Sequence, residues 1–206
     1  AATLLQQVTS AKYLGLHIDD DLKWNTMVDH IAKTVSSKIA ILFRHRQCLP
    51  MPCRSTYLRC IILPTFQYAC NSFSSSLSSA QRDRLEKLLK RAVRVVCSAP
   101  FLSPTAPLFE RLSIQPLQSM YCRKLLLLTF RVIHNNCSVL LHDLVTPLSH
   151  TRRTRSTDVP LLLFPRIISA AATRSPSYQC PALWNKLPAS IRSLKKPGQF
   201  RTALLP

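Results

Sequence analysis

The sequence predicts a mainly α-helical protein with a short N-terminal β-hairpin and a looser C-terminal tail. Apolar residues recur at helical spacing in several stretches, most clearly in residues 80–96. One short stretch, residues 12–18, alternates in the manner of a β-strand instead. Glycine occurs only twice in 206 residues, which argues against a glycine-rich phosphate-binding loop anywhere in the chain.

The N-terminal hairpin is predicted from this alternating stretch. In residues 12–18 (KYLGLHI) every second residue is apolar, as expected of a half-buried strand. Gly15 indicates a position where another group approaches the backbone closely. The three aspartates at 19–21 predict a turn, after which a second short strand can follow at 22–24.

Two helices are predicted next. Asn25 or Thr26 can cap the first helix, which ends near Arg46, before two prolines. The second helix begins near Cys53, and Pro64 should kink it or end it, because proline lacks an N–H and clashes with the preceding turn. The apolar face of the first helix consists of Val28, Ile31, Val35, Ile39 and Leu42.

The clearest helix spans residues 80–96. It follows a serine-rich stretch, residues 71–79, which predicts a loop. Ser78 or Ser79 can cap the helix. Its expected apolar stripe consists of Leu85, Leu88, Leu89, Ala92, Val93 and Val96.

Prolines mark the remaining elements. A short helix is expected around 108–112, and Pro116 suits the first position of a long apolar helix that runs to about His134. A basic linker (TRRTR) follows at 151–155. The tail contains an expected strand at 161–164 and short helices at 176–187 and 197–204. These elements divide the sequence into three regions, 1–24, 25–147 and 148–206.

The net charge of the chain is unusual. Lysine and arginine number 28 against 9 acidic residues, which gives a formal charge of +19. Such a charge favours polyanionic partners, because each phosphate contact releases a counterion. Nucleic acid fits this requirement, and so does an anionic membrane surface.

The basic residues of the 80–96 helix form the best candidate for a nucleic-acid contact. Their spacing of three, four and three residues places four of them on one face, with two others at its flanks. The alternative is an ordinary solvated helix face. The candidate residues are Arg84, Lys87, Arg91 and Arg94 on the face, with Arg82 and Lys90 at its flanks.

The eight cysteines show no CxxC pair and no spacing typical of a zinc site. Several lie in apolar stretches, as at Cys60, Cys97 and Cys122, which indicates buried free thiols in a reducing compartment. Residues 1–10 do not resemble a signal peptide, and no apolar run is long enough to span a membrane. We therefore expect an intracellular location, in the nucleus or cytoplasm, and no metal or cofactor.

Four short blocks occur in an order that resembles the region after the catalytic palm in reverse transcriptases of LINE-like, non-LTR retrotransposons. The first three are KYLGLHIDDDLKW at 12–24, the proline-to-tyrosine segment that ends at Tyr68, and QRDRLEKLLKRAVRVV at 81–96. The fourth is Ala182 to Pro188 (ALWNKLP), followed by an Ile-Arg pair and Phe200. Together the blocks are distributed along nearly the whole chain, from residue 12 to residue 200.

This resemblance implies a role for each region. Residues 1–24 would be the end of the palm, with Tyr13, Leu14 and Gly15 in a primer-grip hairpin. Residues 25–147 would form a helical thumb that contacts an RNA–DNA hybrid or duplex, and 148–206 a basic linker and tail. The Tyr-x-Asp-Asp turn of such polymerases does not occur in this sequence. We therefore expect a fragment that is not an enzyme on its own, with the missing palm as a further partner.

Two other functions compete with nucleic-acid binding. The helices could serve as a protein-interaction module, or the chain could be a decayed gene fragment without a retained activity. Part of residues 12–96 is also similar to a segment of some alkylation-repair oxygenases. There, His17 and Asp19 would match two ligands of an iron site, with His134 or His150 as a third. Chance explains that spacing better, since the sequence predicts no barrel of strands.

Trp184 has two interpretations. An exposed tryptophan could stack on a nucleobase. A buried one would anchor the tail to a hydrophobic core, and this second interpretation is favoured.

Overall fold

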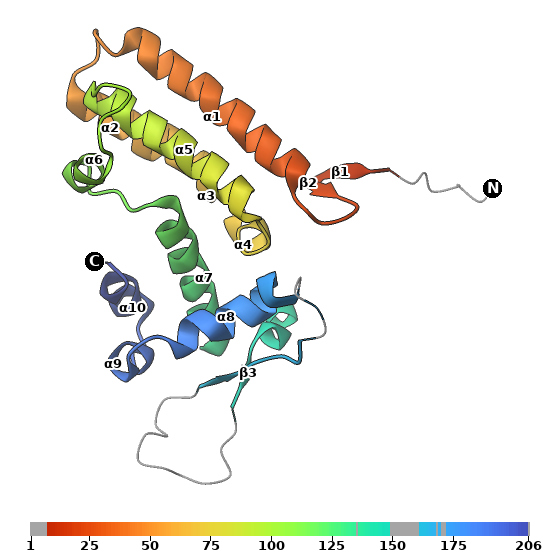
Figure 1. Ribbon diagram of the computed structural model, residues 1–206. Helices are drawn as coiled ribbons and strands as arrows, with labels where there is room; N and C mark the ends of the chain where they lie inside the picture. Colours follow the sequence, from red (N-terminus) through yellow and green to blue (C-terminus); the bar gives the residue numbers. More distant parts are fainter. Residues whose placement is uncertain (1–7, 135, 149–160, 168, 170–171, 206) are drawn as a thin grey trace. The chain divides into compact units, whose positions relative to one another are not determined.

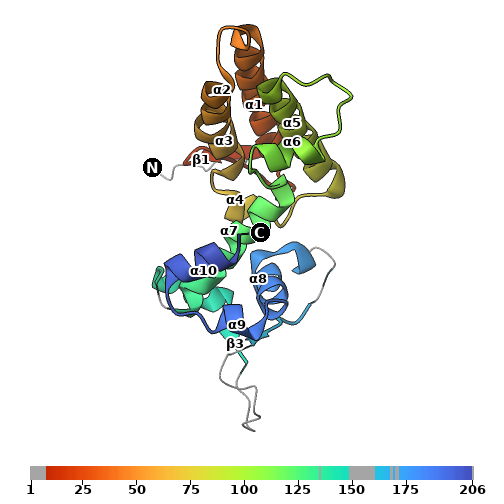
Figure 2. The same ribbon diagram turned by 90° about the vertical axis from the view of Figure 1, so that its left-hand side faces the viewer.

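A computed structural model describes residues 8–134, 136–148, 161–167, 169 and 172–205 (Figures 1 and 2). These residues form a mainly helical protein with a two-stranded N-terminal hairpin, as predicted. The chain divides into two compact units. Unit 1 contains residues 1–73 and 77–119, and unit 2 contains residues 74–76 and 120–206. The sequence-based boundary near 147 falls inside unit 2.

Unit 1 contains the hairpin and most of the helices. Its elements are β1 (Ser10–Tyr13), β2 (Leu16–Asp19), α1 (Asn25–His45), α2 (Met51–Tyr57), α3 (Leu63–Gln67), α4 (Cys70–Phe73), α5 (Ser79–Cys97), α6 (Ala106–Arg111) and the beginning of α7 (Leu117–Ile133).

The hairpin turns at Leu14 and Gly15, so the prediction of one strand over 12–18 with a second at 22–24 is wrong. β1 and β2 pair antiparallel, with Tyr13 opposite Leu16. Leu14 and Gly15 have positive φ angles of 47° and 81°, as the tight two-residue hairpin turn requires. An alternating pattern records which face a residue occupies, and it does not show where the chain reverses.

α1 begins without the predicted cap at Asn25 or Thr26. Trp24 precedes the helix in a left-handed conformation (φ 63°), and its side chain provides no cap. Asp19 provides one instead, because its buried carboxylate accepts the Thr26 N–H at 3.3 Å. The predicted turn at the aspartates is present, since the Leu22 N–H donates to the Asp19 carbonyl at 3.0 Å.

The second predicted helix passes Pro64 through a π-helical turn. α2 is followed by this turn at Leu58–Ile62 and then by α3. Pro64 has no N–H to donate to the preceding turn, and its ring would clash with a carbonyl there. The wider π-helical turn tolerates the missing hydrogen bond and makes room for the ring. The Ile61 carbonyl is satisfied by the Lys38 ammonium at 3.0 Å and the Thr65 hydroxyl at 3.1 Å.

Hydrogen bonds show the relative directions of the three main helical segments of unit 1, which are α1, α5 and the segment from α2 to α3. Gln81 at the start of α5 donates to Asn25 at the start of α1, at 2.8 Å. α1 and α5 therefore run parallel, side by side (Figure 1). Arg54 in α2 contacts Ser98 at the end of α5, so α2 and α3 return in the opposite direction.

The core of unit 1 forms where these three helical segments pack together. It confirms the predicted apolar face of α1 completely, whereas Leu88 on α5 is only half-buried and Val95 is buried in addition. The stretch at 71–79, predicted as a loop, begins with the short helix α4, whose Phe73 contacts the Trp24 ring. The largest core side chains are Ile31, Ile39, Leu42, Leu58, Ile62, Phe66, Phe73, Leu77 and Leu85.

Unit 2 has a hydrophobic core of its own. Its elements are the rest of α7, a 3-10 turn at Val139–Leu144, β3 (Thr146–Pro147), β4 (Leu162–Leu163), a 3-10 turn at Ala172–Arg174, α8 (Pro176–Asn185), α9 (Ala189–Arg192) and α10 (Pro197–Ala203). The predicted strand at 161–164 is confirmed by β4, which pairs antiparallel with β3. The predicted basic linker at 151–155 lies outside the described residues.

The C-terminal segment supplies the centre of this core. Trp184 is 1% exposed and Phe200 is fully buried, with their ring centroids 5.7 Å apart. Phe200 also stacks on Phe130 of α7 at 4.4 Å. Asn185 binds the backbone of Leu162 on both sides, accepting from its N–H and donating to its carbonyl, each at 2.9 Å. The prediction of Trp184 as a core anchor is therefore confirmed.

All eight cysteines lie among the described residues, and none of them forms a disulfide bond. Of the three cysteines predicted to be buried, Cys97 and Cys122 are only half-buried, and the buried cysteines are Cys70 and Cys180 instead. Cys60 is exposed, so its predicted burial is wrong, because it lies on the outer face of the π-helical turn. No helix among the described residues is long and apolar enough to cross a membrane.

Candidate nucleic-acid interface

The basic helix α5 is held at both ends by local hydrogen bonds. Ser78 accepts the Gln81 N–H at 3.3 Å, and the Gln81 side chain accepts the Ser78 N–H at 2.8 Å. This capping box satisfies two backbone donors that no helical carbonyl can reach. At the other end Ser98 adopts a left-handed conformation (φ 52°), and the Ala99 N–H returns to the Arg94 carbonyl at 3.0 Å. The basic side chains of α5 therefore project from a helix whose ends are well defined.

Five of the six predicted basic residues of α5 line one groove between α1 and α5. The groove has a volume of about 700 Å³. Arg84, Lys87 and Arg91 are exposed, whereas Lys90 and Arg94 are half-buried. The full lining is Asp29, Ala32, Lys33, Ser36, Ala80, Arg84, Lys87, Leu88, Lys90, Arg91, Arg94 and Phe101.

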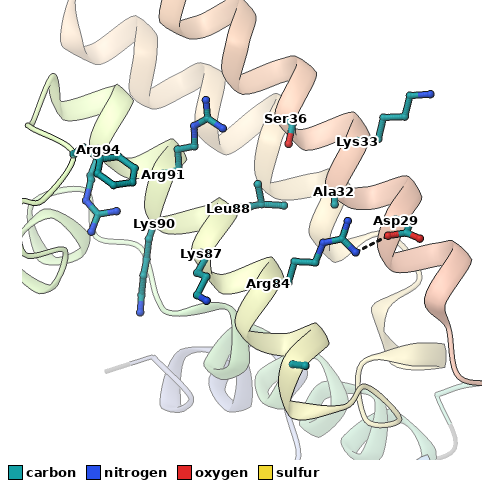
Figure 3. Close-up of a pocket in the computed structure, with 12 residues that line it drawn as sticks. Asp29, Ala32, Lys33, Ser36, Arg84, Lys87, Leu88, Lys90, Arg91 and Arg94 are labelled. Carbon is teal, nitrogen blue, oxygen red and sulfur yellow. Dashed lines mark hydrogen bonds and ion pairs between the residues drawn. The ribbon is translucent and has the colours of Figure 1, made fainter.

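Figure 3 shows how the labelled side chains lie in this groove. Leu88 of α5 and Ala32 of α1 lie between the two helices, and Arg84 reaches across to Asp29. In this view Lys87 and Lys90 extend along the side of α5 that faces away from α1, and Lys33 extends outward from α1. The groove therefore has a small apolar floor and cationic side chains along its rims.

Two of the groove arginines already have partners. Arg84 forms an ion pair with Asp29 at 2.5 Å, with both side chains more than half exposed. Arg94 donates its Nε–H to the Ser103 carbonyl at 3.0 Å and thereby holds the loop after α5. Within the described part of the chain, Lys33, Lys87, Lys90 and Arg91 have no ion pair and no side-chain hydrogen bond. Lys33, Lys87 and Arg91 are the exposed members of this set, so they are free for an external anion.

The acidic residues near the groove offset little of its charge. Asp29 is the one carboxylate among the residues that line it, and Arg84 occupies that carboxylate. Glu86 also lies on α5, but its carboxylate accepts the Leu117 N–H at 2.9 Å, at the start of α7. The groove therefore keeps an excess of positive charge that the fold itself does not neutralise.

The groove contains charged and aromatic residues that the spacing along α5 does not predict, and one predicted residue of α5 does not line it. Lys33, Asp29 and Phe101 line the groove, but their role depends on how α1 and the loop after α5 lie against α5. Periodicity within one helix carries no information on that arrangement. Arg82 was predicted as a flanking contact, yet it is not among the lining residues.

The predicted primer-grip residues form the tip of the hairpin, where Tyr13 and Leu14 are 65% and 74% exposed. The expected close approach to Gly15 is present, because a Cβ at that position would lie 3.5 Å from the ring of Tyr68. The Tyr68 hydroxyl donates to the Leu14 carbonyl at 2.5 Å. Tyr68 therefore stabilises the turn by contacting its backbone, while the side chains of Tyr13 and Leu14 remain exposed to solvent.

His17 and Asp19 both contact α1 in the described structure. Asp19 caps α1, and the ring of His17 lies 4.8 Å from the ring of His30 on α1. Partial desolvation of the imidazole, followed by the charges of His17, Lys12 and Lys33, lowers the pKa of His30. Among the described residues, no group of three or more histidines, cysteines or carboxylates is placed to hold a metal ion.

Comparison of the chain with protein-family models, curated proteins and solved structures finds no match.

Proposed function

We propose that the groove between α1 and α5 binds the sugar-phosphate backbone of a nucleic-acid duplex, such as an RNA–DNA hybrid. On this proposal unit 1 is the thumb-like part of a non-LTR retrotransposon RNA-directed DNA polymerase. The observation that carries the proposal is the set of three exposed cations without a partner among the described residues, Lys33, Lys87 and Arg91, which two different helices bring to one groove.

The charge of the groove fits a polyanion better than a single small anion. The basic residues from Arg84 to Arg94 extend over roughly 15 Å of helix. One strand of a duplex rises by that distance over about four nucleotides. Like charges at one-turn spacing destabilise a helix slightly, and a row of phosphates would convert this repulsion into attraction.

The proposed polymerase origin is supported by contacts among three of the sequence blocks that resemble such enzymes. Tyr68 of the second block binds Leu14 of the first. Gln81 of the third block donates to the carbonyl of Lys23 at 2.9 Å, and Lys23 lies in the first. Blocks that occur in a family-like order are thus also neighbours within one compact unit.

The proposal concerns binding and not catalysis by this chain. Phosphoryl transfer by two metal ions needs several carboxylates that clamp both ions. The groove has Asp29, whose carboxylate pairs with Arg84, and otherwise cationic or uncharged side chains. A groove of this composition holds a phosphate backbone by charge and hydrogen bonds.

The test replaces the three exposed cations of this set, Lys33, Lys87 and Arg91, with glutamine. Arg84 and Arg94 remain unchanged, since their partners lie within the protein. We expect binding of a fluorescently labelled RNA–DNA hybrid to weaken at least tenfold, as a rough figure, at about 100 mM salt. The slope of log affinity against log salt should become less steep by about three, roughly one for each lost phosphate contact.

A matched control separates the groove from net charge. Lys124, Lys195 and Lys196 are exposed residues of unit 2, and their change to glutamine removes the same charge. This variant should keep most of the affinity. Equal losses in both triple variants would contradict a site in the groove. Binding that does not respond to salt between about 50 and 200 mM would contradict backbone recognition altogether.

A further inference from the structure

The basic groove continues into a second cavity with an aromatic rim. This cavity has a volume of about 760 Å³ and is lined by residues from the ends of α1 and α5 and from the loop after α5. Arg91, Arg94 and Phe101 line both cavities. The unpaired cations and the aromatic rim therefore form one continuous surface of unit 1.

The rim presents two phenylalanine rings to solvent. Phe101 is 77% exposed and Phe43 is 49% exposed. Each ring has a guanidinium near it: that of Arg46 lies 3.9 Å from the centroid of the Phe43 ring, and that of Arg94 lies 5.9 Å from the Phe101 ring. Aromatic rings and guanidinium planes are the groups on which unpaired nucleobases stack.

The loop that carries Phe101 is ordered by hydrogen bonds. Arg94 binds the Ser103 carbonyl at 3.0 Å, and the Ser103 N–H donates to the Pro100 carbonyl at 3.1 Å. This turn, which begins with Pro100, keeps Phe101 outside the core. The hydrogen bond to Ser103 also fixes the Arg94 guanidinium near the Phe101 ring. A well-defined exposed ring beside a polyanion-binding groove is typical of sites for single-stranded nucleic acid.

We propose that this aromatic rim, Phe43 with Phe101, stacks unpaired nucleobases of a strand whose phosphates lie along Lys87 and Arg91. The preferred ligand is then a hybrid or duplex with a single-stranded extension. This inference rests on the proposed backbone binding in the groove and adds a contact to the bases. Stacking involves the faces of the bases, so little sequence preference is expected.

The experiment compares three labelled ligands on the full chain at one fixed salt concentration. The ligands are a blunt RNA–DNA hybrid, the same hybrid with a short single-stranded extension, and the same extension built from abasic nucleotides. The two extended ligands carry the same number of phosphates, so a difference between them reports contact with bases. We expect the extension with bases to bind roughly tenfold more tightly than the abasic one.

Variants of the rim assign this difference to its residues. Changing both Phe43 and Phe101 to alanine should abolish the difference and leave the affinity for the abasic ligand unchanged. A second variant, Phe101→Leu, keeps an apolar side chain and should lose part of the difference. Leu102 is 90% exposed beside Phe101 and lines neither cavity, so Leu102→Ala is the matched control that should behave as the unchanged protein.

The outcomes distinguish this inference from the function on which it rests. Equal binding of the two extended ligands, with intact salt-dependent binding of the blunt hybrid, overturns the stacking site and leaves the groove proposal standing. A base-dependent difference that persists in the double alanine variant also overturns the stacking site. Absence of binding to all three ligands overturns both proposals.

Discussion

The two units use their motif residues in opposite ways. In unit 1, helix α5 buries most of its leucines and valines and leaves Lys87 and Arg91 at a groove, without partners among the described residues. In unit 2, the sequence block that contains Trp184 and Asn185 stabilises the fold. The Trp184 ring lies in the core, and the Asn185 side-chain amide hydrogen-bonds the backbone of β4. Residues of the first kind are therefore candidates for binding, whereas residues of the second kind stabilise the fold.

Thiol reactivity should show the largest difference between exposed positions in unit 1 and core positions in unit 2. In unit 1, Cys48, Cys53 and Cys60 are exposed, whereas Cys180 in the core of unit 2 is fully buried. Burial raises the pKa of the Cys180 thiol to about 11, so little reactive thiolate forms near neutral pH. With a maleimide and peptide mass spectrometry, we expect Cys180 to react at least about a thousandfold more slowly. Comparable rates would mean that the core of unit 2 opens readily.

Loss of the Trp184 side chain should give the largest loss of stability among single substitutions. Trp184→Ala leaves a cavity in the core of unit 2, and we expect a loss of about 3–5 kcal/mol in the free energy of unfolding. Urea denaturation measures it. Trp184→Phe retains a ring and should cost less. A loss below about 1 kcal/mol would indicate a side chain that does not pack in the core.

The two glycines should respond to alanine with opposite signs. Gly15 has a φ of 81°, where an alanine is strained, so Gly15→Ala should cost about 1 kcal/mol. Gly198 lies within α10 with open space at its Cβ position, so Gly198→Ala should stabilise by up to about 1 kcal/mol. Thermal unfolding of the two variants measures both effects. A neutral Gly15→Ala would contradict the tight turn at the tip of the hairpin.

Removal of the groove carboxylate should increase binding while leaving stability nearly unchanged. Asp29→Asn releases Arg84 for a phosphate contact, so we expect severalfold tighter binding and a salt slope steeper by about one. The ion pair is exposed, and its loss should change the free energy of unfolding by less than about 1 kcal/mol. Asp143→Asn, in unit 2, makes the same charge change and serves as the control. Weaker binding by Asp29→Asn would contradict the proposed groove.

A small pH dependence should arise at His30, beside the hairpin. Its pKa in the folded protein lies below the ordinary value of 6.5, chiefly through partial desolvation of the ring beside His17. The unfolded chain therefore binds the proton more readily, and stability is lost as the pH falls below about 6.5. His30→Gln should reduce this loss in urea titrations at two pH values. His45→Gln removes a histidine from the same helix as a control, and an equal response of both variants would contradict a role for His30.

Much of unit 1 could be predicted from local signals in the sequence. The apolar face of α1, the serine cap of α5 and the interruption at Pro64 all depend on residues within one or two helical turns. The hairpin turn was misplaced, because Leu14 is an unusual residue for a positive φ and carries no turn signal. The cap of α1 was missed because Asp19 lies seven residues before the N–H that it accepts.

The candidate site was only partly predictable for the same reason. Spacing along α5 placed its basic residues on one side, since helical geometry alone determines that side. Lys33 and Phe101 joined the site because α1 runs parallel to α5 and because Arg94 binds the following loop. Both conditions are contacts between segments distant in sequence, and periodicity does not record them.

The sequence by itself determined the helical class, the positions of most helices and the excess of positive charge. Each of these follows from residue type and short-range spacing, which act through backbone geometry and simple charge. Tertiary structure decided which cations remain free. It paired Arg84 with Asp29, held Arg94 against a loop and left Lys33, Lys87 and Arg91 without partners among the described residues. An ion pair or hydrogen bond depends on distances that only packing sets.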